Sequence, residues 1–115
     1  MFHALEFSLT VLDLLAEVET RVRLHRKSLA DQIGRAAESI ALNLAEGRCR
    51  AGLDRADFYR RAAGSAGELT AALRIARARG YITPAQFAAV DAPLDRVRAI
   101  TWALTHRPAH ARVSR

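Results

Sequence analysis

The chain has 115 residues, half of them hydrophobic and only three of them proline, and its formal net charge is +6 at pH 7. A chain of this length and composition is expected to fold as one globular domain around a single core. Its apolar runs stay short of the roughly 20 residues that cross a bilayer, which excludes a membrane-spanning helix. The N-terminal segment has no basic region before its apolar stretch, so no signal peptide is expected. The single cysteine, Cys49, excludes an internal disulfide framework and favours a cytoplasmic protein.

Apolar residues recur every three or four positions along the chain, and no stretch alternates in the manner of a strand. We therefore predict an all-α fold with helices at about 4–24, 28–46, 54–79 and 84–106. The connections are short enough to make consecutive helices antiparallel, which gives an up-down-up-down four-helix bundle over residues 1–107. The basic segment 108–115 lacks periodicity and is expected to fray.

The first predicted helix carries two apolar stripes. One stripe consists of Leu5, Leu9, Leu12, Leu15 and Val22, and the other of Phe7, Val11, Leu14 and Val18. Together they cover more than half of the circumference, which is more than one neighbouring core can bury. Part of this helix is therefore expected to pack against another subunit.

The second predicted helix has candidate residues for its start and its end. Ser28 and Asp31 have the spacing of a capping box, with Asp in place of the usual Glu. Gly47 suits the position just after the last turn. The third helix is expected to start near Asp54 and to end at Gly80.

The fourth predicted helix has the clearest start. Thr83 is followed by Pro84 and, three positions on, by Gln86, which together give an N-cap, a first-turn proline and the second half of a capping box. Pro93 lies inside the helical pattern and is expected to kink or interrupt it.

Catalytic and metal-binding patterns are absent from the sequence. The Glu-x-x-His pairs of di-iron bundles do not occur, and Pro108 separates His106 from His110. No histidine lies near Cys49 to act as its base, and a pairing of Glu46 with Glu68 would more naturally be structural. We expect no catalytic, cofactor-binding or metal-ligating residue, and a protein that is not an enzyme.

Arginines give the strongest functional signal. Seventeen of the 18 basic residues are arginine, and residues 48–80 hold eight arginines against three acids. Paired guanidinium donors suit phosphate, so we predict nucleic-acid binding, RNA or DNA, mainly through the backbone. The predicted contact residues are Arg48, Arg50, Arg55, Arg60, Arg61, Arg74, Arg77, Arg79, Arg96 and Arg98. A cationic face that docks an acidic protein, and a merely solubilising surface, are the alternatives.

A polar ladder interrupts the second helix. Ser39, Asn43 and Glu46 recur at steps of four and three, which places them on one helical face. The third helix offers Ser65 and Glu68 opposite that face. Because buried polar groups must find partners, we predict that these five residues form a hydrogen-bond network between helices or between subunits.

The segments DQIGRAAESIALNLAEG and FYRRAAGSAGELTAALRIARARGYI resemble the ribosomal-RNA intervening-sequence protein family, a family of bacterial four-helix bundles. The matching positions include Gln32, Ser39, Asn43, Glu46, Gly47, Gly64, Ser65, Glu68 and Gly80. The resemblance covers roughly residues 29–82 and depends on polar positions as well as apolar ones.

The resemblance implies a homopentamer with a basic surface. Some relatives of this kind are similar to the accessory variability determinant of diversity-generating retroelements, which implies nucleic acid and a reverse transcriptase as partners. The sequence departs from the family pattern at Gly34, where an arginine is usual, and at Cys49, where a glycine is usual. If that glycine needs a positive φ, the loop at Cys49 would be strained.

Overall fold

A computed structural model describes residues 3–106, and every regular element within that range is an α-helix. The helices are α1 (His3–Arg23), α2 (Lys27–Arg48), α3 (Gly52–Ala78) and α4 (Pro84–Thr105). Their ends differ by at most two residues from the ends expected from the sequence. The segment 108–115, predicted to fray, lies outside the described residues.

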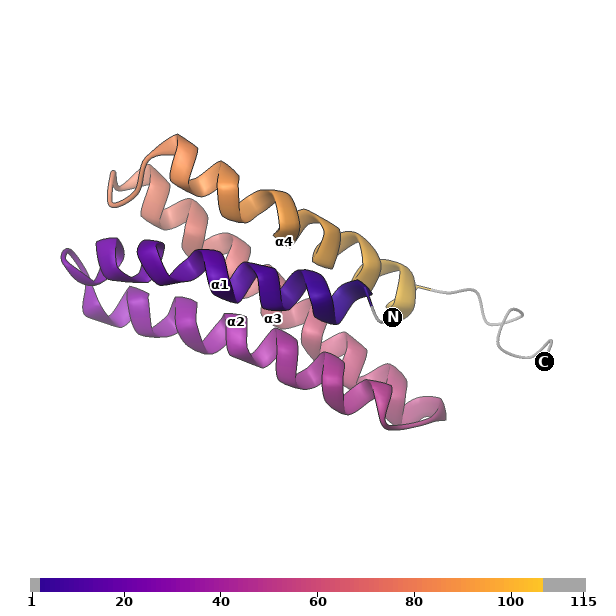
Figure 1. The fold of residues 1–115 in the computed structure, drawn as a ribbon. Helices are drawn as coiled ribbons and strands as arrows, with labels where there is room; N and C mark the ends of the chain where they lie inside the picture. The colour runs from indigo at the N-terminus through magenta and orange to yellow at the C-terminus, as the bar shows by residue number, and fades with distance from the viewer. Residues whose placement is uncertain (1–2, 107–115) are drawn as a thin grey trace.

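The helices form a four-membered ring of contacts. Each helix packs on the helices before and after it in the chain, and α1 also packs on α4. Figure 1 shows the α1–α2 and α3–α4 connections together at one end of the bundle. The α2–α3 connection lies at the other end, with the start of α1 and the end of α4 (Figure 1). Residues 24–26 and 79–83 are therefore neighbours, although they are far apart in sequence. None of the helices in this part of the chain is both long and apolar enough to span a membrane.

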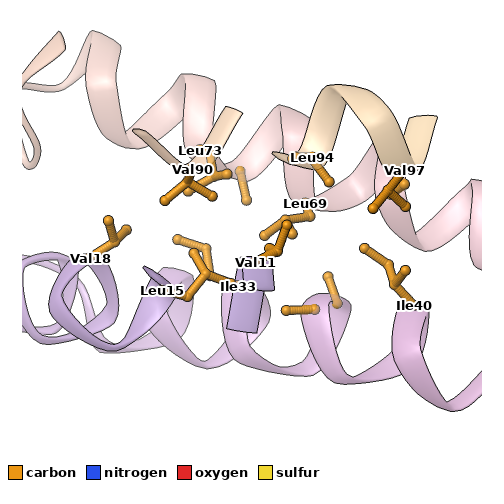
Figure 2. Close-up of a cluster of buried hydrophobic side chains, with 14 of the residues drawn as sticks. Val11, Leu15, Val18, Ile33, Ile40, Leu69, Leu73, Val90, Leu94 and Val97 are labelled. Carbon is orange, nitrogen blue, oxygen red and sulfur yellow. The ribbon is translucent and has the colours of Figure 1, made fainter. Parts of the chain in front are cut away.

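The core runs along the axis of the bundle, where all four helices contribute aliphatic side chains (Figure 2). Its largest fully buried members include Leu15, Ile33, Ile40, Leu69, Leu73 and Leu94. Burial of one such side chain stabilises the fold by roughly 1.5–3 kcal/mol. The interior side chains therefore fix the mutual orientation of the helices, and with it the positions of the surface arginines.

The two apolar stripes predicted on α1 are not the surface that α1 buries. Its buried positions are Ala4, Ser8, Val11, Leu15, Val18 and Val22, a seam that takes residues from both stripes. Leu9 and Leu14 remain 44% and 40% exposed, one on each side of the seam. A seam with steps of three and four is narrow, as in coiled coils, so one chain leaves Leu9 and Leu14 open, whereas Leu5, Phe7 and Leu12 are partly buried against the core.

The predicted cap of α2 is wrong, whereas that of α4 is confirmed. Helix α2 has Arg26 as its N-cap and no side-chain capping bond, so Ser28 lies inside the first turn. Asp31, the other half of the predicted box, instead forms an ion pair with Arg23 at 2.9 Å. At α4, the Thr83 hydroxyl accepts from the Gln86 backbone N–H, and the Gln86 side chain accepts from the Thr83 N–H. Helix α4 continues without interruption through Pro93.

The glycines near the α2–α3 connection do not have the expected roles. Gly47 is buried inside α2, which extends to Arg48, and a Cβ atom there would lie 2.7 Å from the ring of Tyr59. Cys49 has an ordinary φ of −86°, so it is not strained. The positive φ nearby occurs at Gly52, the first residue of α3, at 61°. Gly80 ends α3 with a φ of 76°, as the sequence predicts.

Candidate nucleic-acid interface

The end of the bundle that holds the α1–α2 and α3–α4 connections is strongly cationic. We call it the basic end and define it as residues 21–28 and 74–83. It contains seven basic residues and no aspartate or glutamate: Arg21, Arg23, Arg26, Lys27, Arg74, Arg77 and Arg79. Among the residues that the structure describes, only Arg23 of these seven forms an ion pair, with Asp31 of α2. Six like charges are therefore left without a compensating carboxylate within ion-pair distance.

The opposite end of the bundle carries arginines too, but it neutralises most of them. Residues 46–61 hold five arginines and three acids. Arg50 forms ion pairs of 2.9 Å with both Glu46 and Asp54, and these carboxylates raise its pKa through hydrogen bonds and charge. Asp57 pairs with Arg61 at 2.8 Å and lies 3.9 Å from Arg60. Paired charges produce a weak field at a distance, so this end attracts a polyanion less than the basic end does.

Two further predicted contact residues at that end are engaged by their own chain. The Arg55 guanidinium donates to the backbone carbonyls of Gly47 and Arg48, at 3.2 and 3.5 Å, and so holds the α2–α3 connection. Arg48 is exposed and also interacts with another part of the chain. Arg55 is better described as a structural residue than as a nucleic-acid contact.

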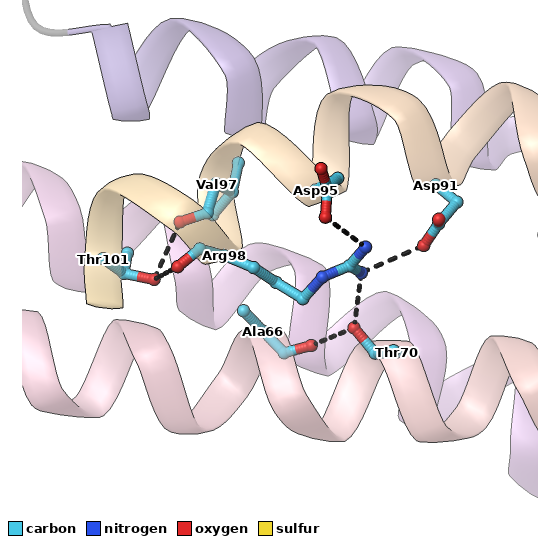
Figure 3. A network of polar contacts seen from close by, with 7 residues as sticks. All are labelled: Ala66, Thr70, Asp91, Asp95, Val97, Arg98 and Thr101. Atoms are coloured by element: carbon cyan, nitrogen blue, oxygen red, sulfur yellow. Dashed lines mark hydrogen bonds and ion pairs between the residues drawn. The ribbon is translucent and has the colours of Figure 1, made fainter. Parts of the chain in front are cut away.

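Arg98 of α4 is also engaged by its own chain, through three side chains. Its guanidinium forms ion pairs of 3.0 Å with Asp91 and Asp95 and donates to the Thr70 hydroxyl of α3 at 3.0 Å (Figure 3). Burial alone would lower the pKa of Arg98, but the hydrogen bonds and charges of the two aspartates outweigh it and raise the pKa. A cation whose donors are already used in this way has little left for a phosphate.

Several arginines lie over aromatic rings. The Arg77 guanidinium is 4.4 Å from the ring centre of Phe87, and that of Arg96 is 5.4 Å from the ring centre of Phe7. Phe58 is half-buried and lies under Arg50 and Arg61. Such contacts orient a guanidinium while leaving its N–H edge available, because the ring covers only its face.

The predicted polar network is present for three of its five residues. A hydrogen bond of 2.8 Å joins the hydroxyls of Ser39 and Ser65 across α2 and α3. The Asn43 amide donates back to the Ser39 carbonyl at 2.8 Å and to its hydroxyl at 3.1 Å. Glu46 and Glu68 are exposed and do not join it: Glu46 pairs with Arg50 instead, and Glu68 forms no bond with another described residue.

The sequence interpretation missed four of the seven cations at the basic end: Arg21 and Arg23 in the last turn of α1, and Arg26 and Lys27 around the start of α2. Residues 25–47 balance to zero net charge, and this average hid a basic cluster at the start of α2. The fold brings that cluster next to Arg79. The sequence did contain a signal for this cluster. Antiparallel helices place alternate connections at the same end of a bundle, so the basic residues of the first and third connections could have been expected to lie together.

The site has the chemistry of an anion-binding surface. Guanidinium groups can bind phosphate oxygens with two parallel donors, and nearby unpaired cations attract a polyanion over about a Debye length, roughly 8–10 Å in ordinary buffers. Within residues 3–106, no three His, Cys, Asp or Glu residues are grouped to hold a metal ion.

The chain resembles known proteins both in fold and in sequence. A protein of unknown function from the S23 ribosomal protein family of Bacteroides thetaiotaomicron, known from a crystal structure, superposes with a TM-score of 0.81. The two chains are 18% identical over 90% of this chain and 98% of the other, so the likeness concerns the fold. Proteins of curated function give no significant match. The family described as 23S rRNA-intervening sequence protein matches residues 3–103, which confirms the resemblance seen in the sequence. The chain belongs to the 23S rRNA-intervening sequence protein family.

Proposed function

We propose that this protein is a non-enzymatic accessory protein that binds nucleic acid through its phosphate backbone, and that the basic end is the contact surface. The observation that supports the proposal is the difference between the two ends of the bundle. The opposite end pairs Arg50, Arg60 and Arg61 with its own carboxylates, whereas the basic end has no acid of its own. A surface of arginines that stays unpaired is suited to an external polyanion.

Binding of this kind releases condensed counterions, so its affinity falls steeply with salt. For single strands, log Kd changes with log salt by about 0.7 for each phosphate that is neutralised. Three to five contacts would therefore weaken binding by roughly 20- to 130-fold between about 50 and 200 mM salt. Fluorescence anisotropy with a labelled single-stranded RNA and its DNA counterpart measures both the affinity and this slope.

Two triple variants with the same loss of charge locate the contact surface. R26Q/K27Q/R79Q removes three cations from the basic end, and R50Q/R60Q/R61Q removes three from the opposite end. We expect the first variant to lower the salt slope by about two and the affinity strongly, and the second to lower them much less. Equal losses in both variants would mean that the basic end is not the interface. No binding by the wild-type protein, even in low salt, would refute nucleic-acid binding altogether.

We further propose that the protein is an antiparallel up-down-up-down bundle that acts as a homo-oligomer of five copies. The apolar surface left open by one chain supports assembly, since Leu42 is 70% exposed on α2 and Leu9 is 44% exposed on α1. Light scattering on the native protein measures the assembly mass, and a monomer at micromolar concentration would contradict the proposal.

A docking scaffold for an acidic protein, such as a reverse transcriptase with an acidic surface, is the second candidate function. Trp102 favours it, because this side chain is 61% exposed at the edge of an α3–α4 groove of about 210 Å³, and exposed tryptophans often anchor protein partners. Co-purification of a protein that survives nuclease treatment and is lost in W102A would support this function. Loss of the same partner on nuclease treatment would instead support nucleic-acid binding.

A further inference from the structure

An open pocket lies at the basic end, where the start of α2 meets the end of α3. Its volume is about 260 Å³. The residues that line it are Arg26, Ser28, Leu29, Gln32, Ile75, Arg79 and Tyr81. They come from the α1–α2 connection, from α2, from the end of α3 and from the α3–α4 connection, so only the folded bundle forms the pocket.

The polar side of the pocket consists entirely of groups that can donate hydrogen bonds to an anion. Arg26 and Arg79 bring two guanidinium groups from separate segments of the chain, and neither has a carboxylate within ion-pair distance in the described range 3–106. Ser28 and Gln32 add a hydroxyl and an amide. No acid lines the pocket, so nothing within it competes for the guanidinium donors.

The other side of the pocket is apolar and partly aromatic. Leu29 is buried, and Ile75, which is 49% exposed, presents aliphatic surface to the pocket. The Tyr81 ring stacks on His25 with their centres 4.8 Å apart and their planes 7° from parallel. This stack joins the two connections and holds Tyr81 at the edge of the pocket. An apolar surface beside two cations suits a molecule with a charged group and a flat ring.

Two other hollows in the described part of the chain lack this combination. The groove lined by Gln32, Arg35, Ser39 and Glu68 contains a carboxylate, which repels phosphate. In the groove beside Trp102 the only arginine is Arg98, whose donors are bound to Asp91, Asp95 and Thr70.

We propose that this pocket binds one nucleotide, with its phosphate between Arg26 and Arg79 and its sugar or base against Ile75 and Tyr81. The inference deepens the proposed function and rests on it, because it assigns one specific binding site within the cationic surface that is proposed to contact nucleic acid. The nucleotide can belong to a nucleic-acid strand or be free in solution, and the chemistry of the pocket is the same for both.

Three single variants separate the pocket from the general charge of the basic end. R79Q removes one guanidinium from the pocket, and R74Q removes the same charge from the nearby end of α3, outside the pocket. S28E lowers the net charge by one as well, but it places a carboxylate inside the pocket. A carboxylate in the first turn of a helix is favourable for folding, so S28E is expected to fold normally, which a thermal melt verifies.

Each variant is titrated with a labelled single-stranded oligonucleotide in low salt. We expect R79Q and S28E to weaken binding about tenfold or more, because a charge-assisted contact is lost, and R74Q to weaken it about twofold. In parallel, the wild-type protein labelled with ¹⁵N is titrated with uridine monophosphate and with inorganic phosphate. The backbone amides of Arg26, Ser28, Gln32 and Arg79 should shift and saturate, and more strongly with the nucleotide.

The outcomes distinguish the pocket from the proposed function. If R74Q, R79Q and S28E weaken oligonucleotide binding equally, the protein still binds nucleic acid but the pocket is not a nucleotide-binding site. Nucleotide-induced shifts spread over all the arginines, with none concentrated at the pocket, would overturn the inference in the same way. If uridine monophosphate saturates the pocket at micromolar concentration and the oligonucleotide binds no more tightly, the ligand is a free nucleotide. Much tighter binding of the oligonucleotide assigns the pocket to a strand.

Discussion

Asp91 and Arg98 lie seven residues apart on α4 and are joined by an ion pair of 3.0 Å, with Asp95 at the same distance from the other side of the guanidinium. The same guanidinium donates to Thr70 of α3, whose hydroxyl donates in turn to the Ala66 carbonyl at 2.8 Å (Figure 3). Arg98 looks like an ordinary surface arginine in the sequence, but its side chain is part of the interface between α3 and α4.

We expect Arg98→Met to destabilise the fold by about 1–2 kcal/mol, because it leaves Asp91, Asp95 and the Thr70 hydroxyl without their shared partner. Urea denaturation measures the change. Arg96→Met is the matched control: Arg96 lies over the Phe7 ring and has no ion pair with a described residue, and its loss should cost less than about 0.5 kcal/mol. Equal stability of the two variants would show that the Arg98 network contributes nothing.

The hydroxyl pair between α2 and α3 should behave as a coupled unit. Ser65 is only 7% exposed, so Ser39→Ala leaves its hydroxyl poorly satisfied and is expected to cost about 1 kcal/mol. The double variant Ser39→Ala/Ser65→Ala should cost less than the sum of the single variants, since both partners are then removed. A double-mutant cycle with chemical denaturation measures the coupling. Strict additivity of the two single effects would show that the hydrogen bond does not contribute to stability.

Gly47→Ala and Gly64→Ala are the same substitution in two helix interiors and should have opposite signs. At Gly47 the added methyl group would lie 2.7 and 2.9 Å from two atoms of the buried Tyr59 ring, so we expect a loss of about 1–3 kcal/mol. At Gly64 the added methyl group would have no atom within 4 Å among the described residues, apart from its chain neighbours and its own helix backbone, so replacing this helical glycine should stabilise the chain by about 0.5–1 kcal/mol.

Thermal melts at low protein concentration compare the two alanine variants with the wild type. A stabilised monomer of Gly64→Ala that assembles poorly would show that another subunit approaches α3 closely at Gly64. Destabilisation of that monomer would contradict the open space seen around this glycine.

Glu19 should make stability depend on pH. Burial raises its pKa above the ordinary value of 4.5, the nearby charge of Glu38 raises it further, and Arg23 opposes both. The folded state therefore holds this proton more tightly than the unfolded state. The stabilisation that comes from this tighter proton binding at Glu19 is fully present below pH 4.5 and is lost as the pH rises through the raised pKa.

We accordingly expect Glu19→Gln to raise the melting temperature at neutral pH and to leave it nearly unchanged well below pH 4.5. Scanning calorimetry across this range measures the difference, and Glu6→Gln controls for the removal of any negative charge from α1. A gain for Glu19→Gln that is the same at both pH values would mean that its burial and the charge of Glu38 are not the cause.

The sequence specified the local structure well because the relevant signals are local. Apolar spacing located the four helices, and the Thr83–Gln86 capping box is formed by groups only three residues apart. Gly80 takes the positive φ expected at the end of α3. Polar spacing also identified Ser39, Asn43 and Ser65, and with them the family.

The errors occurred where partners distant in the chain, or alternative local ones, decide the outcome. Ser28 was a plausible cap, but the chain turns at Arg26 and Asp31 is held by Arg23. Gly47 was a plausible helix end, but it is small because Tyr59 packs against it. Spacing along one helix cannot indicate which ring or charge another segment will bring.

The sequence by itself determined an all-helical chain with an excess of arginine, because periodicity and composition need no tertiary contact. Only the tertiary structure decided which arginines remain open to a partner. Arg98 and Arg50 are held by carboxylates, whereas Arg26 and Arg79, 53 positions apart, line one pocket without an acid. The physical reason is that the effect of a charge depends on its neighbours within a few ångströms, and packing of the helices sets those neighbours.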